Sequence, residues 1–206
     1  MNTTVFSHQT LAPDLIKLVL QFDEAQAHVS GQYSVLRLPG IAGQGYYSIA
    51  SPASAQPKMT FLIRVGDSPL DQALAKLKVG DQANAEAPAG KFELGNQGDA
   101  LVFVAGGTGI APMLAMLLQS VENVDQRPKR LLYGMRDETE AGFQSELASL
   151  RHAGVQIDLY IGEPVCLDSS ISSTAAIYAC GPKPMLEALA EQAESLGLEV
   201  PLTEPY

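Results

Sequence analysis

A glycine-rich segment near the middle of the chain has the residue types of a phosphate-binding turn. It lies between an apolar run and a helical pattern, and it contains Gly106, Gly107, Thr108, Gly109 and, in the first helical turn, Pro112. Glycines let a backbone turn sharply and approach a ligand closely, and a helix N-terminus offers unpaired N–H groups to a phosphate. We therefore predict that this loop binds a pyrophosphate. A plain tight turn is the alternative, because the third glycine of the dinucleotide fingerprint is absent.

A second strand-to-helix turn reads Cys180-Gly181-Pro182, and Met185 follows in the helical pattern. In an open parallel sheet, ligands bind beyond the carboxyl ends of the strands, where the strand order reverses. We expect both loops at that edge, with Cys180 near the reacting end of the ligand. The alternative is that Cys180 is a small core residue, which is the commoner position of a free cysteine.

Both loops belong to the second half of the chain, where strand and helix patterns alternate. This alternation predicts a parallel sheet wrapped by right-handed crossovers. Strands are expected at 100–105, 130–133, 155–161 and 175–179, and helices at 112–120, around 143–150 and at 186–196, the last ending at Gly197.

The first half alternates apolar and polar residues with the period of half-buried strands, as in 16–22, 59–65 and 82–87. Short strands between turns predict a small antiparallel barrel, with one helix from about 69 to 76 that begins after Ser68. We expect the antiparallel β-barrel domain to cover residues 1–97 and the α/β parallel-sheet domain to cover residues 98–206.

The composition excludes several classes of function. The formal net charge is −10, and so acidic a surface repels nucleic acid and anionic lipid, so we expect neither nucleic acid nor a membrane as a partner. The two cysteines, Cys166 and Cys180, form no zinc or disulfide pattern, and no cluster has metal-ligand spacing. We therefore expect a cytoplasmic protein with no metal site.

Five motifs in order resemble the ferredoxin–NADP reductase family over nearly the whole chain. They are Tyr47-Ser48-Ile49-Ala50-Ser51, the stretch 87–92, the glycine loop with its following proline (106–112), the stretch 132–136, and Cys180-Gly181-Pro182 with Met185. The resemblance implies a flavin-binding barrel followed by a nucleotide-binding α/β domain. It also implies an NAD(P)H-dependent flavin oxidoreductase, which passes a hydride from C4 of NADPH or NADH to N5 of FAD, with FMN as an open alternative. The acceptor it implies is a redox partner protein, such as a ferredoxin or an oxygenase component, or a small molecule such as free flavin.

The resemblance also implies roles for individual residues. Tyr47 packs along the flavin, Ser48 places its hydroxyl near N5, and Cys180 lies by C4 of the nicotinamide. The flavin contacts then comprise Tyr47, Ser48, Ile49 and the backbone of Ile63, Arg64 and Val65, and the nucleotide contacts comprise Gly106, Gly107, Thr108, Gly109, Pro112, Cys180, Gly181, Pro182 and Met185.

Two further positions leave alternatives open. Arg136 and Asp137 follow the second strand of the α/β half, where the adenosine ribose is read, and an arginine favours NADP whereas an acid favours NAD. A solvated surface pair is the alternative there. By resemblance, the terminal Tyr206 covers the flavin and moves aside for the nicotinamide, and a frayed terminus is the alternative.

The sequence departs from the family pattern at the flavin pyrophosphate. Gly45 stands where the family has an arginine, and the helix whose N-terminus should serve the same group carries Asp67 and Asp71. Lys58, Arg64 and Lys91 are candidate replacements for the missing cation. Three interpretations follow: FAD held by other cations, a weakly bound FMN or free flavin substrate, or a flavin-poor or flavin-free nucleotide-binding or partner-binding module.

Overall fold

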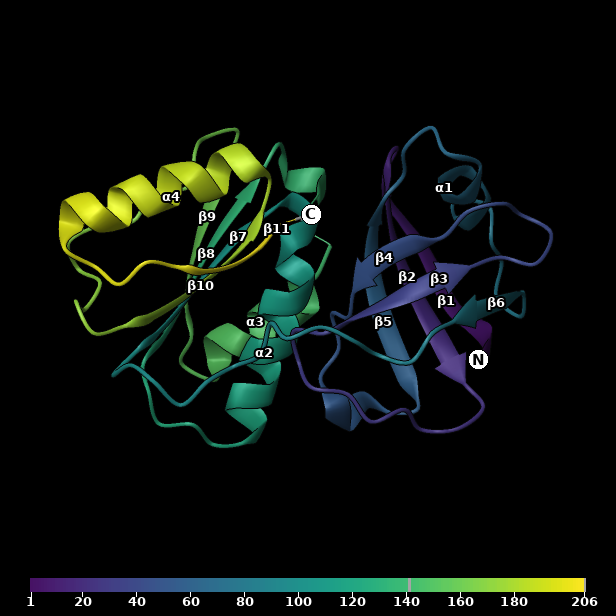
Figure 1. Cartoon of the computed structure of the whole chain (residues 1–206), viewed down its shortest axis with the longest axis horizontal. Helices are drawn as coiled ribbons and strands as arrows, with labels where there is room; N and C mark the ends of the chain where they lie inside the picture. The colour runs from purple at the N-terminus through teal and green to yellow at the C-terminus, as the bar shows by residue number, and fades with distance from the viewer. Residues whose placement is uncertain (141, 206) are drawn as a thin grey trace.

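The computed structural model describes residues 1–140 and 142–205, which form two lobes side by side (Figure 1). The N-terminal lobe holds a six-stranded antiparallel sheet in the order β4-β3-β6-β1-β2-β5. A bridge between Ile49 and Phe61 joins the two edges of this sheet and closes the predicted barrel. The strands are β1 (Asn2–Ala12), β2 (Leu15–Phe22), β3 (Tyr33–Arg37), β4 (Gly45–Ser48), β5 (Lys58–Arg64) and β6 (Gln82–Ala85).

Alternation of side chains along β2 and β5 builds the barrel core. Leu18, Leu20 and Phe61 are buried there, and helix α1 (Pro69–Leu74) covers one end of the barrel with Leu70 and Leu74. The predicted cap is confirmed, because the Ser68 hydroxyl accepts a hydrogen bond from the Asp71 backbone N–H at 3.0 Å.

The C-terminal lobe is a five-stranded parallel sheet in the order β11-β10-β7-β8-β9. Its first two strands in the chain, β7 and β8, are neighbours, and the chain then reverses direction across the sheet, so that β7 and β10 flank the switch point. The strands are β7 (Leu101–Gly106), β8 (Lys129–Met135), β9 (Gln156–Ile161), β10 (Ala176–Gly181) and β11 (Leu202–Pro205).

Helices cover both faces of the parallel sheet (Figure 1). Helices α2 (Ile110–Glu122) and α3 (Gln144–His152) pack on the face towards the barrel, and α4 (Lys183–Leu196) packs on the other. Helix α4 ends as predicted, because Gly197 has φ +67° and ψ +31°, the left-handed conformation of a helix-terminating glycine. No helix in the described ranges is long and apolar enough to span a bilayer.

In the parallel sheet, one strand was not predicted. Strand β11 pairs in parallel with β10 and brings Glu204 opposite Cys180. It has only four residues, between Pro201 and its own terminal Pro205. Pairing with β10 across a long sequence separation forms this strand, and no local periodicity indicates it.

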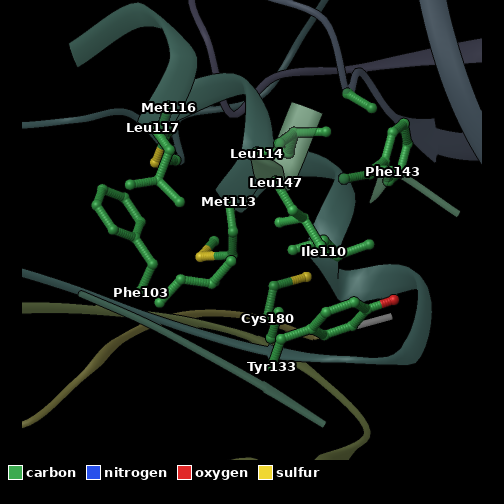
Figure 2. Packing of buried hydrophobic residues seen from close by; sticks show 14 of the residues in the cluster. Phe103, Ile110, Met113, Leu114, Met116, Leu117, Tyr133, Phe143, Leu147 and Cys180 are labelled. Atoms are coloured by element: carbon green, nitrogen blue, oxygen red, sulfur yellow. The ribbon is translucent and has the colours of Figure 1, made fainter. Parts of the chain in front are cut away.

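The two lobes share a hydrophobic core, part of which Figure 2 shows. Leu15, Leu62 and Phe92 of the barrel belong to the same buried cluster as Leu114 of α2 and Leu147 of α3. An apolar contact of this kind fixes the carboxyl end of the parallel sheet relative to the barrel.

Candidate functional site

The glycine loop lies directly after β7, at the switch point of the parallel sheet. Strand β7 ends at Gly106, a 3-10 turn (Gly107–Gly109) follows, and α2 begins at Ile110. Gly107 has φ +53°, which non-glycine residues rarely adopt. The loop therefore presents bare backbone and a helix start at the ligand edge of the sheet.

Contacts with the second loop explain why two of the glycines have no side chain. A Cβ at Gly109 would lie 2.1 Å from the carbonyl oxygen of Cys180, and a Cβ at Gly106 would lie 2.7 Å from Sδ of Met185. The two turns predicted from sequence are thus packed against each other. Their contact forms the floor of one site.

A cavity of about 800 Å³ opens above this floor. The first loop contributes Gly106, Gly107 and Thr108, and the second loop contributes Pro182 and Met185. The lining extends on one side to the end of β8, where Arg136 lies, and on another to Arg64 of the barrel. The cavity thus connects the nucleotide edge of the sheet to the end of β5, and its size suits a nucleotide.

Other predicted residues lie behind the cavity wall. Gly109 and Pro112 are buried in α2 and its start, and Gly181 ends β10 without lining the cavity. They support the loops and do not face the open space.

Cys180 is buried in the core, with 1% of its surface exposed. Figure 2 shows its side chain beside Tyr133 and Ile110, beneath α2. Burial, and after it the charge of Glu204, raises the pKa of the Cys180 thiol to about 12. The position agrees with the core alternative, and the role of Cys180 beside a nicotinamide stays a prediction.

Glu204 is a site neighbour that sequence reasoning did not single out as a candidate. It faces Cys180 across the β10–β11 pairing, and burial raises the pKa of its carboxyl. Its position depends on the unpredicted strand β11, so no local pattern indicated it. The predicted contact of Tyr206 lies outside the described residues.

Arg136 and Asp137 do not pair with each other. Arg136 Nε lies 3.1 Å from Glu140 Oε1, and Arg136 Nη2 lies 3.3 Å from Asp14 Oδ2. Asp137 instead accepts hydrogen bonds from the backbone N–H and the hydroxyl of Thr139, which lower the pKa of its carboxyl. Arg136 keeps 67% of its side chain exposed, so it remains accessible at the cavity rim.

Arg64 joins the two lobes through carboxylates. Its Nη1 lies 2.9 Å from Asp14 Oδ1 and 2.8 Å from Glu140 Oε1. Only 5% of the Glu140 side chain is exposed, so its paired cations offset the hydration that this carboxylate loses on burial. Arg64 is therefore neutralised by two carboxylates and does not replace the cation missing at Gly45.

The other two candidate cations, Lys58 and Lys91, do not replace the missing arginine either. Nζ of Lys58 lies 3.5 Å from the centroid of the Phe6 ring, in a cation–π contact. Lys91 is exposed and has no ion pair in the described part of the chain. None of these three candidates is positioned to take the place of the expected arginine.

Some of the predicted flavin contacts are engaged in contacts within the barrel, and others are free to bind a ligand. Ile49 and Ile63 are completely buried in the barrel core, and the Val65 N–H donates to the Asp14 carbonyl at 2.8 Å. The backbone N–H and C=O groups of successive residues in a strand point to opposite edges. Those of Val65 point towards β2, so those of Arg64 point to the other edge of β5, towards β4. Ser48 is half-buried beside this edge, and its hydroxyl has no hydrogen-bond partner in the described ranges.

Tyr47, in β4, packs against the barrel core and is folded back over its own strand. Its Oη donates to Asp71 Oδ1 at 3.1 Å, and a Cβ at Gly45 would lie 2.3 Å from the same Oη. Burial, followed by the charge of Asp71 and this hydrogen bond, raises the pKa of Tyr47, which keeps the phenol protonated.

The two nucleotide cofactors therefore fit this chain differently. The glycine loop, the cavity and the exposed Arg136 suit a nicotinamide nucleotide. For a flavin, Ser48 and the free edge of Arg64 suit the polar side of a ring. The residues around Gly45 and Asp71 do not suit the diphosphate of FAD, because they supply a carboxylate where a cation is needed.

Comparison with known families assigns both halves of the chain. Residues 2–94 match the oxidoreductase FAD-binding domain, and residues 103–191 match the oxidoreductase NAD-binding domain. Methane monooxygenase component C of Methylosinus trichosporium is 34% identical over 149 residues, which cover 68% of this chain and 44% of that protein. The toluate 1,2-dioxygenase electron transfer component of Pseudomonas putida is 32% identical over 194 residues, which cover 84% of this chain and 56% of that protein.

Solved structures share the fold over the full length. A ferredoxin NADP+ reductase from Neisseria gonorrhoeae with bound FAD and NADP superposes with a TM-score of 0.83 at 19% identity, covering 100% of this chain and 98% of that one. Phthalate dioxygenase reductase superposes with a TM-score of 0.84 at 20% identity, covering 100% of this chain and 69% of that one.

The chain spans about half the length of these two curated relatives. The two matched domains follow each other in the order of the barrel and the parallel sheet. The chain therefore belongs to the ferredoxin–NADP reductase family of oxidoreductases, as a module with an FAD-binding domain followed by an NAD-binding domain.

Proposed function

We propose that this chain is an NAD(P)H-dependent flavin oxidoreductase, which transfers a hydride from NAD(P)H to a flavin and then passes electrons to an acceptor. The cavity at the switch point carries the proposal, because one space connects the glycine loop to Arg64 at the end of the barrel. A nicotinamide ring and a flavin ring must meet for a hydride to move between them, and this is the part of the fold where they can.

On the nucleotide side, we assign the diphosphate to the backbone of Gly107 and Thr108, which line the cavity just before α2, with the buried Gly109 supporting this turn. The turn Cys180-Gly181-Pro182 then bounds the nicotinamide end, and Arg136 bounds the adenosine end. This assignment is supported by the contact of the two turns and by the exposed Arg136 side chain. The chain contributes mainly positioning, since the hydride chemistry belongs to the cofactors.

On the flavin side, Ser48 and the peptide of Arg64 are proposed to meet the polar edge of the ring. The domain division proposed here is residues 1–97 for the flavin and residues 98–206 for the nucleotide. The half-buried Ser48 hydroxyl supports this side of the assignment.

We further propose a cytoplasmic location, which suits the exposed free thiol of Cys166.

The acceptor is proposed to be a redox partner protein or a small oxidant. The matched relatives are named as a component of methane monooxygenase and as an electron transfer component of toluate 1,2-dioxygenase. An oxygenase component is therefore the first acceptor to test, and free flavin is the second.

The test is an anaerobic titration of the purified protein with added FAD, first with NADH and then with NADPH, followed by visible absorbance. We expect stoichiometric bleaching of the flavin band that is much faster than in protein-free FAD. Calorimetry of NADH and NADPH binding to the protein without flavin provides the second readout. Nucleotide binding without any bleaching would instead favour the flavin-free binding module, and neither binding nor bleaching would exclude both.

A further inference from the structure

A hydrogen-bonded network of three side chains joins β4 to the start of α1. In this Tyr47 network, Tyr47 Oη donates to Asp71 Oδ1 at 3.1 Å, and the Ser68 hydroxyl donates to Asp71 Oδ2 at 2.7 Å. The Asp71 backbone N–H in turn donates to the Ser68 hydroxyl at 3.0 Å. The negative charge beside the first turn of α1 is therefore supplied by the chain itself.

Gly45 makes this network sterically possible. A Cβ at position 45 would lie 2.3 Å from Oη of Tyr47 and 2.4 Å from its ring carbons Cε2 and Cζ. Any larger residue at 45 would displace the ring and break its contact with Asp71. The missing arginine and the folded-back tyrosine are thus one coupled change, and the ring occupies the space where a longer side chain at 45 would begin.

The coupled change reverses the local charge. In a diphosphate site a cation faces the phosphates, whereas here the Asp71 carboxylate does, and Asp67 lies exposed in the preceding turn. The nearest arginine on β5, Arg64, is held between Asp14 and Glu140. Like charges at short range repel, so a flavin diphosphate gains no stabilisation at this position.

We propose that the barrel binds a flavin by its isoalloxazine ring alone, with the Tyr47 network excluding the phosphates, so that an uncharged flavin of the riboflavin type binds at least as tightly as FAD. Such a ligand exchanges readily and is suited to act as a substrate that leaves after reduction. This inference rests on the proposed flavin oxidoreductase function and specifies the flavin that it uses.

The experiment measures the dissociation constants of riboflavin, FMN and FAD on the full chain by quenching of flavin fluorescence. We expect the constants for FMN and FAD to be equal to or weaker than that for riboflavin. A diphosphate held by a charged hydrogen bond would make FAD at least about tenfold tighter, and that result would overturn the inference while leaving the proposed function intact. If none of the three flavins binds although NADH does, both the inference and the proposed function fail.

Two variants test whether the Asp71 carboxylate is what weakens FAD binding relative to riboflavin. Asp71→Asn removes the carboxylate of the network, and we expect it to tighten FAD about fivefold relative to riboflavin. Asp67→Asn is the matched control, because Asp67 carries the same charge just before α1 but its side chain makes no hydrogen bond in the described part of the chain. Its effect on the ratio should stay below about twofold. An unchanged ratio in Asp71→Asn overturns the inference, and the wild-type ligand series decides it independently if that variant fails to fold.

Discussion

Gly109 is the position where the nucleotide site is most sensitive to a single methyl group. Its φ is −60°, so alanine accepts the backbone conformation, and the whole effect of Gly109→Ala comes from the new Cβ. That atom would lie 2.1 Å from the carbonyl oxygen of Cys180, about 1.3 Å short of the 3.4 Å at which ordinary contacts begin. The obstacle is backbone on both sides, so the two turns must separate.

Overpacking of this kind costs about 2–3 kcal/mol. For a chain of this size, we expect the midpoint of thermal unfolding to fall by about 5–10 °C. Because the turns that form the floor of the cavity move apart, NADH affinity should also fall by about tenfold or more. Differential scanning calorimetry and NADH titration measure the two effects on the same sample.

Gly197→Ala is the control that separates steric overlap from backbone strain. Gly197 has φ +67° and no atom within 4 Å of its added Cβ, so alanine there costs only about 1 kcal/mol of backbone strain. We expect a fall of about 2–4 °C in the midpoint with no change in NADH affinity. If Gly109→Ala behaved like Gly197→Ala, or left both quantities unchanged, the packing of the two turns would not be what defines the site.

Three further predictions concern charged and ionisable groups. Glu140→Gln removes the buried carboxylate that pairs with Arg64 and should lower the free energy of unfolding in urea by about 2 kcal/mol. Glu138→Gln, at an exposed position, should change that free energy little. Equal effects of the two variants would contradict the pairing of Glu140 with Arg64. Cys180 should resist iodoacetamide in the native protein at pH 8 while the other, exposed cysteine reacts, as peptide mapping would show, because burial raises its pKa to about 12. The hydrogen bond from Arg127 lowers the pKa of Asp125 from 3.8 to about 2, so between about pH 4 and pH 2 the unfolded state binds more protons than the folded state. The free energy of unfolding should therefore fall by about 1 kcal/mol as the pH is lowered from 4 to 2. Asp125→Asn should abolish this part of the pH dependence.

Sequence reasoning anticipated the elements whose patterns are local. The apolar alternation of β2, the helix start at Ser68 and the left-handed Gly197 all follow from residues within a few positions of one another. The glycine loop was likewise predicted in place, because a buried strand, three glycines and a helix start are adjacent in the chain.

Long-range contacts account for what was missed. Strand β11 forms only because β10 offers an edge to it, and Glu204 reaches Cys180 only through that pairing. The burial of the Cys180 thiol likewise depends on α2 packing over the sheet. Glu204 carries no sequence pattern that reveals this environment, whereas for Cys180 the sequence left a core position and a contact with the ligand as open alternatives.

The flavin end depends both on features that the sequence shows locally and on contacts that only the folded chain makes. The absence of a cation at Gly45 and the presence of Asp71 were visible in the sequence alone, because they are matters of residue type. Only the tertiary structure decided that Tyr47 occupies the space beside Gly45 and donates its hydroxyl to Asp71. The reason is physical: charge and backbone preference belong to single residues and their neighbours, whereas the enclosure of a side chain depends on segments brought together by the folded chain.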